Sequence, residues 1–277
     1  MRECLLLFNE LPPNIGKLLA ILSDEKSDAK MVADVVELNP AVAAKILKVV
    51  NSSYSGLRGK ITNLKRAVTL LGYDNVRALI LGLSTFSMSK AMMLPNELPI
   101  GQLWKHSAAV GHLAGIIASK IGGIDVPTLL SGGLLHDIGK LVLAATFKGR
   151  FAKAVRLSNN REGELIDIEL RAFGLTHPIV GAALCSLWNL PERLWGLIAA
   201  QEHPALGPDV TTAACLKLAE FIARSHSIGA DGQWAHGFVP EDICWYMEKT
   251  SDEISKLTCP AEIRAVVKNV NVVTGWE

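Results

Sequence analysis

Apolar residues recur three and four positions apart along most of the chain, whereas alternating runs typical of strands are nearly absent. This pattern predicts an all-α protein. Turn and capping residues separate the helices, which we expect at about 29–38, 40–50, 62–71, 74–88, 103–121, 147–158, 162–172 and 210–224. One last amphipathic helix is expected over about 240–257, followed by a short tail.

Histidines divide the chain unevenly, because the first one is His106. We therefore predict an N-terminal helical module over residues 1–97 and a second helical module over 98–225 that carries the chemistry. Residues 226–277 would form a C-terminal helical extension. A chain of 277 residues can bury a large core without disulfides or metals to hold it together.

Charge and cysteine content exclude several classes of protein. The net charge of +1 gives no overall attraction to nucleic acid or to a membrane surface. Five scattered cysteines without a C-x-x-C pair favour a reduced, cytosolic compartment. No secretory signal and no transmembrane helix are predicted. The basic residues Arg58, Lys60, Lys65 and Arg66 leave DNA binding as a weaker alternative to a solvated helix pair.

Polar side chains on apolar helix faces are the main chemical signal. His106 shares a stripe with Val110, whereas His112 lies off that stripe and is expected to face outward. His136 and Asp137 lie in an apolar, helix-like run and need partners there. Side chains of this kind, converging from separate helices, predict a divalent-metal site, although any single histidine is more often a hydrogen-bonded core or surface residue. The candidate ligands are His106, His136, Asp137, His177, His203 and Glu220.

The motifs that suggest a family are Asn39-Pro40, Leu71-Gly72, Trp104-Lys105-His106-Ser107, the run from Leu134 to Lys140, and Trp188-Asn189-Leu190-Pro191. Together with the N-terminal helical module, they make the chain resemble the HDOD branch of the HD superfamily of metal-dependent phosphohydrolases, over about residues 11–221.

The resemblance implies a role for each candidate ligand. His106 matches the first HD histidine, His136-Asp137 matches the defining doublet, and Glu220 takes the place of the closing aspartate. His177 and His203 match later histidines of the related cyclic-di-GMP phosphodiesterases. Two departures matter: the Gly-Tyr-Pro signature is missing after His203, and the closing aspartate is replaced by Glu220, which is one methylene longer. Glu202 also stands where those enzymes have the first histidine of their His-His pair.

The HDOD resemblance implies a bacterial signal-output or regulatory module, so we expect a cytosolic signalling domain that retains an HD-type pocket. The alternative is an active phosphohydrolase or phosphodiesterase acting on a nucleotide or phosphate ester. In that case Asp137 would bridge ions of Mn, Fe, Mg, Ni or Zn, and Lys140 would neutralise a phosphate. The expected partners are a signalling protein or a phosphate ligand, and self-association stays open.

Overall fold

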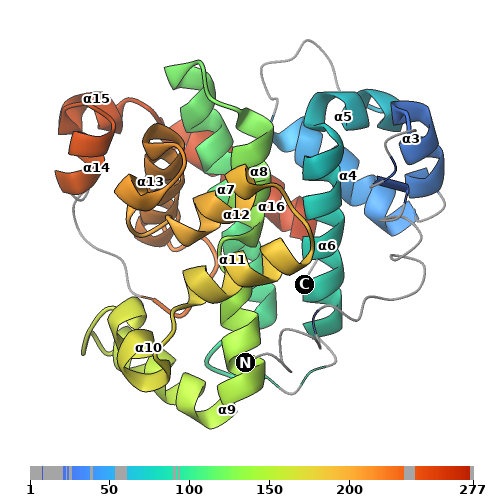
Figure 1. Cartoon of the computed structure of the whole chain (residues 1–277). Coiled ribbons are helices and arrows are strands. Elements are labelled where there is room, and N and C mark those ends of the chain that lie inside the picture. Colours follow the sequence, from blue (N-terminus) through green and yellow to red (C-terminus); the bar gives the residue numbers. More distant parts are fainter. Residues whose placement is uncertain are drawn as a thin grey trace.

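The computed structural model describes residues 27–37, 40–53, 61–89, 94–233 and 241–274, with Phe8, Ile21, Leu22, Asp24 and Met92. Every regular element within these residues is a helix, which confirms the predicted all-α class (Figure 1). Arg58 and Lys60, which form half of the basic edge, lie outside the described residues. The DNA-binding alternative stays a prediction from the sequence.

The N-terminal module contains α3 (Ala29–Glu37), α4 (Pro40–Ser53), α5 (Leu64–Leu71) and α6 (Tyr73–Ser89). Helix α5 begins after Asn63, whose side chain accepts a hydrogen bond from the backbone N–H of Arg66. It ends at Gly72, whose φ of 77° lies in the region that favours glycine. Helices α3 and α4 pack on α5, and α4 also contacts α6.

The first helix of the second module, α7 (Ile100–Ile121), is also its central helix. It packs against α8 (Val126–Leu135), α13 (Val210–Ser225), α16 (Pro260–Thr274) and α4. Because neighbours cover α7 on several sides, His112 is buried, and the expectation that it faces outward was wrong. The remaining elements are α9 (Ile138–Asn159), α10 (Leu165–Phe173), α11 (His177–Leu187), α12 (Glu192–Ala199) and the 3₁₀ turn η1 (Pro204–Leu206).

The two modules share one apolar core. Helix α6 packs on α8, and one continuous cluster of buried residues extends from the N-terminal helices into α7 through α12. Arg77 reinforces the contact, because its Nη2 donates a hydrogen bond to the carbonyl oxygen of Trp188 at 2.6 Å. The division near residue 97 stays a prediction from the sequence, but the structure joins its two sides through common packing.

The C-terminal extension differs from the single helix predicted over 240–257. The described residues form α14 (Glu241–Tyr246), α15 (Ser251–Ser255) and α16. A capping box explains the break: the Thr250 side chain accepts from the backbone N–H of Glu253, and the Glu253 carboxylate accepts from that of Thr250. This arrangement starts a new helix at Ser251, and the expected short tail is largely the helix α16.

The stretch Val126–Asn159 is apolar and long enough to span a membrane, but 94% of its most apolar window is buried inside the fold. It comprises α8 and α9, which form part of the core. Core packing therefore accounts for its hydrophobicity.

Helices α7 and α8 cross at two glycines, and this close crossing sets the position of the residues that follow α8. A Cβ atom on Gly133 would lie 2.3 Å from the Cα of Gly111. Gly133→Ala should therefore force the helices apart and lower the free energy of unfolding by about 1–3 kcal/mol. Urea denaturation would measure the loss. Gly149→Ala is the control, because its Cβ would meet nothing within 4 Å; equal effects of the two substitutions would contradict the close crossing.

Candidate metal centre

His136 and Asp137 lie in the turn between α8 and α9, rather than inside one helix as the sequence suggested. His136 closes α8, and Asp137, with φ −98° and ψ 5°, leads into α9. Gly139 permits this turn to press against α11, since a Cβ at that position would lie 2.0 Å from the carbonyl oxygen of His177. The chain reversal thereby aims both side chains of the doublet at the same buried point.

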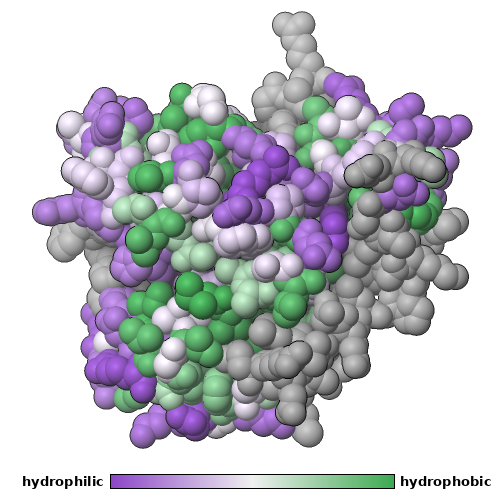
Figure 2. Space-filling model, viewed as in Figure 1, coloured by the Kyte–Doolittle hydropathy of each residue, from purple (hydrophilic) through white to green (hydrophobic). Residues whose placement is uncertain are grey.

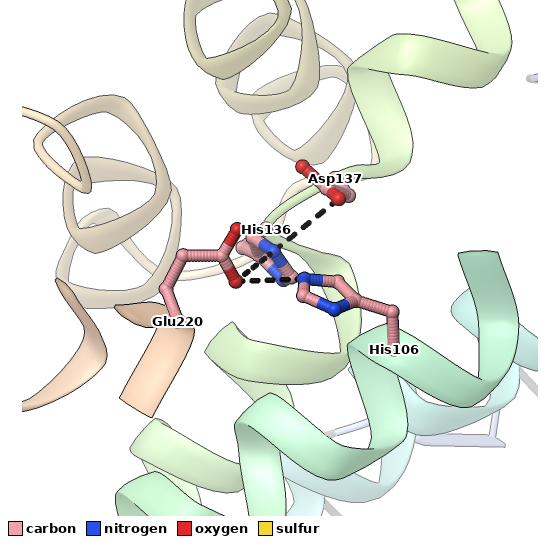
Figure 3. Close-up of side chains that lie close together, drawn as sticks. All are labelled: His106, His136, Asp137 and Glu220. Atoms are coloured by element: carbon pink, nitrogen blue, oxygen red, sulfur yellow. Dashed lines mark hydrogen bonds and ion pairs between the residues drawn. The ribbon is translucent and has the colours of Figure 1, made fainter. Parts of the chain in front are cut away.

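Four side chains converge at that point and form what we call the four-ligand group (Figure 3). One ligand atom from each lies within 4.8 Å of the others. Glu220 Oε2 lies 2.8 Å from His106 Nε2 and 3.1 Å from His136 Nε2, and the latter nitrogen lies 3.4 Å from Asp137 Oδ2. All four residues are buried. The group consists of His106 from α7, His136, Asp137 and Glu220 from α13.

Backbone carbonyl groups orient both imidazoles in this group. His136 Nδ1 lies 2.7 Å from the carbonyl oxygen of Gly133, and His106 Nδ1 lies 3.2 Å from that of Ile228. A ring nitrogen next to a carbonyl oxygen must donate, so Nε2 of each ring is the atom directed at the other members of the group. Hydrogen bonds of this kind typically fix metal-binding histidines in place.

His177 lies beside the four-ligand group, on the far side of Asp137. Its Nε2 lies 3.5 Å from Asp137 Oδ1, and neither atom makes a hydrogen bond within the described part of the chain. The buried carboxylate of Glu169 holds the ring: its Oε2 accepts from the His177 backbone N–H at 2.8 Å and from Nδ1 at 2.7 Å. Thr176, which precedes α11, makes no side-chain capping hydrogen bond, so the Glu169 carboxylate supplies the acceptor for the first backbone N–H of this helix.

His203 is not brought into the site. It is exposed and immediately precedes η1, whereas the other five candidate ligands are buried. A bend at Gln201 and Glu202 follows α12, and Gln201, two residues before His203, faces the site instead. Gln201 is 5% exposed and donates from Nε2 to the carbonyl oxygen of His136 at 3.1 Å.

Lys140 has a different environment from the one expected of a phosphate-binding residue. Its side chain is fully buried, and its Nζ lies 2.9 Å from Asp137 Oδ2 and 2.9 Å from Asp231 Oδ2. Burial alone lowers the pKa of Lys140, but the two carboxylates outweigh that effect and raise it above its usual value. Lys140 is thus a permanent cation inside the fold.

Arg224 completes this buried network. It pairs with Glu220, four residues earlier on α13, and its Nη2 lies 2.9 Å from Asp231 Oδ2. Burial opposes ionisation of Glu220, yet the charge of Arg224, followed by those of His106 and His136, holds the pKa of this carboxyl well below its usual value. The carboxylate is therefore ionised and ready to bind a cation.

Four residues around the site were not predicted from the sequence: Glu169, Arg224, Asp231 and Gln201. The burial of Glu169 could have been predicted, because this residue lies on the same helix face as Leu165 and Ile168. The same criterion identified Glu220. Arg224 could have been predicted to pair with Glu220, because it follows Glu220 by four residues on the same helix. Asp231 lies in a glycine-rich segment without periodicity, and no sequence pattern singles it out.

His136 makes the stability of the metal-free protein depend on pH. Burial lowers the pKa of its imidazole, but Asp137 and Glu220 outweigh this and raise it to about 9 from 6.5. Stability from the raised pKa is fully present below pH 6.5 and is lost as pH rises from 6.5 to 9. The expected loss is roughly 3 kcal/mol. Urea denaturation of chelator-treated protein across this range would measure it, and His136→Asn should flatten the curve; an unchanged slope in that variant would contradict the assignment.

A cavity of about 660 Å³ opens beside the four-ligand group. Glu220 belongs to both, so the group and the cavity share this side chain. Helices α10, α13 and α14 supply much of the wall, and Gln201 and Glu202, in the bend that follows α12, also line it. A volume of this size is typical of small-molecule sites. We call it the central cavity.

A family model described as the HDOD domain matches residues 9–204. The chain belongs to the HDOD family. This confirms the resemblance suggested by the sequence motifs. An uncharacterised protein of Treponema pallidum (strain Nichols) is 25% identical over 210 residues, which cover 73% of this chain and 39% of that protein. The chain spans less than half the length of the curated relatives that it matches.

Solved structures of other HDOD-like proteins share the fold. An HDOD domain protein of unknown function from Geobacter sulfurreducens superposes with a TM-score of 0.71 at 21% identity, over 98% of both chains. A Shewanella amazonensis protein, named provisionally as a phosphohydrolase, gives a TM-score of 0.64 at 21% identity, over 96% of this chain and 98% of that one. Identities this low establish architecture alone.

Proposed function

We propose that this HDOD protein is a bacterial signal-transduction module whose HD-type centre binds a divalent metal ion for regulation rather than for turnover. The observation that carries the proposal is the buried four-ligand group. Two imidazoles and two carboxylates are a ligand set that suits Mn, Fe, Mg, Ni or Zn. A bound ion of this kind supplies Lewis acidity and lowers the pKa of a bound water.

The chain's own residues fit such an ion well. His136 Nε2 and Asp137 Oδ1 are buried polar atoms without a hydrogen bond in the described structure, and a ligated cation would satisfy them. His177 Nε2 is in the same situation and faces Asp137. Asp137 and His177 would help to hold the metal, and Glu169 would keep the His177 ring in its present orientation.

The surroundings favour regulation over phosphate chemistry. Lys140 is enclosed between two aspartates and does not line the central cavity. The basic residues among the described cavity lining are Lys217 and Arg224, and both already pair with carboxylates. A phosphate ester entering the cavity would meet an excess of negative charge. The acidic lining residues are Glu164, Glu202, Glu220, Glu241 and Asp242.

A phosphohydrolase is the second candidate function. One observation supports it: Glu220 belongs both to the four-ligand group, which would hold the metal, and to the lining of the central cavity, which would admit a phosphate ester. The Shewanella relative's provisional name points to the same reaction. In that case bound metal, rather than Lys140, would have to neutralise the phosphate oxygens.

Metal analysis combined with an activity screen distinguishes these proposals. The purified chain would be stripped, reloaded with Mn²⁺ or Fe²⁺, and analysed for bound metal by mass spectrometry. Phosphomonoesters, bis(p-nitrophenyl) phosphate and cyclic dinucleotides would then be tested as substrates. The regulatory proposal expects bound metal that is lost in His136→Asn, without turnover. Turnover lost in the same variant would establish the hydrolase, and absence of metal binding would overturn both.

A further inference from the structure

Helix α14 carries an exposed aromatic residue on the side away from its buried contacts. Ile243 and Met247 are buried and fix α14 against the core around α13, whereas Trp245 is 74% exposed. The Trp245 ring contacts that of Tyr246 edge to face, with centroids 5.0 Å apart. A large aromatic side chain that is exposed to solvent on a firmly packed helix is typical of an interaction site.

Trp245 lies in a surface groove of about 790 Å³, which we call the α14 groove. Val210, which is 36% exposed at the start of α13, adds a second apolar contact. The capping box of Thr250 and Glu253 fixes the opposite wall, because Glu253 Oε2 accepts from the Thr250 backbone N–H at 2.8 Å. The groove is thus formed by three helices held in place by hydrogen bonds and packing.

The rim of the α14 groove is acidic. Glu241, Glu248 and Glu253 line it, and Lys249 is the basic residue among the described lining positions. Hydrophilic residues gather over α14 and α15 at the upper left of Figure 2, which agrees with a charged rim. Carboxylates beside an exposed indole form a favourable site for a guanidinium or ammonium group, through ion pairing and cation–π contact.

We propose that the α14 groove binds a basic segment of a partner protein, with an arginine or lysine placed on Trp245 and an apolar neighbour on Val210. Charge complementarity selects this occupant, since nucleic acid and anionic membranes would be repelled by the three glutamates. Asp242 and Ile243 of the same helix line the central cavity. A partner on α14 therefore lies one helix away from the metal centre, but its binding does not require metal.

The probe is a fluorescein-labelled dodecapeptide made of equal parts Arg, Leu and Gly, added to the full chain without metal and followed by fluorescence anisotropy. Trp245→Ala should weaken binding by about tenfold or more, as removal of an interface tryptophan usually does. Glu248→Gln with Glu253→Gln should weaken binding and reduce its salt dependence, and glutamine preserves the capping box. Exposed residues elsewhere supply the controls, Leu170→Ala and Glu192→Gln, which should leave the affinity unchanged.

Three results would overturn the proposal. A matched peptide with Glu in place of Arg could bind equally well, or Trp245→Ala could bind the basic peptide like the unchanged chain. Sedimentation equilibrium could also show a dimer that Trp245→Ala dissociates, in which case a second copy of the chain covers the groove. Because the assay contains no metal, each of these results is independent of the proposed metal-binding function.

Discussion

Replacing Lys140 with methionine is expected to lower the free energy of unfolding by about 3–5 kcal/mol, the usual cost of removing one partner from a buried ion pair. Lys140 is fully buried, and its ammonium group bonds to Asp137 and Asp231. Methionine has a similar length and fills the same apolar space. Because Arg224 still pairs with Asp231, the loss would report the charge left uncompensated on Asp137, rather than a packing defect.

Urea denaturation at pH 7 would measure this loss. Lys153→Met, on the exposed side of the same helix, is the control and should change stability by less than about 0.5 kcal/mol. Adding Asp137→Asn to Lys140→Met should restore part of the stability, because Arg224 still neutralises Asp231. A loss below about 1 kcal/mol for Lys140→Met would show that water reaches this network.

The helix pattern predicted burial well wherever a residue lies on the apolar stripe of its own helix. His106 and Glu220 were expected to face inward on that basis, and both are buried. His112 was misjudged because α7 has no exposed long face: α8, α13, α16 and α4 all contact it. An amphipathic pattern assumes that one side of a helix faces the core and the other faces solvent. It therefore cannot reveal a helix that other helices surround.

The partners of buried charges were harder to predict than the buried charges themselves. The sequence placed Lys140 one turn after Asp137 but contained nothing to show that Asp231, in a distant loop, would meet it. His203 depends on the direction of a single bend after α12, which periodicity does not determine. The four-ligand group is a subset of the six candidate ligands, and the structure places its members side by side. The contacts that support them required three-dimensional packing.

Metal affinity is expected to fall more than about 100-fold in Glu220→Gln, since losing a residue that merely orients a ligand already costs 10–100-fold. Glutamine keeps the size and one oxygen of the side chain but removes its charge. Glu220 Oε2 approaches both His106 Nε2 and His136 Nε2, so the carboxylate lies where a shared cation would be bound. Arg224 would retain Asp231 as a partner, which should preserve the fold.

Calorimetric titration of chelator-treated protein with Mn²⁺ at pH 7.5 would measure this effect. Glu202→Gln is the matched control, because Glu202 lines the central cavity but lies outside the four-ligand group. Glu220→Asp keeps the negative charge on a shorter side chain. This variant should therefore bind Mn²⁺ more tightly than Glu220→Gln does. If Glu220→Gln binds Mn²⁺ as well as the unchanged chain does, the ion must lie elsewhere, and the pair of His177 and Asp137 becomes the next site to test.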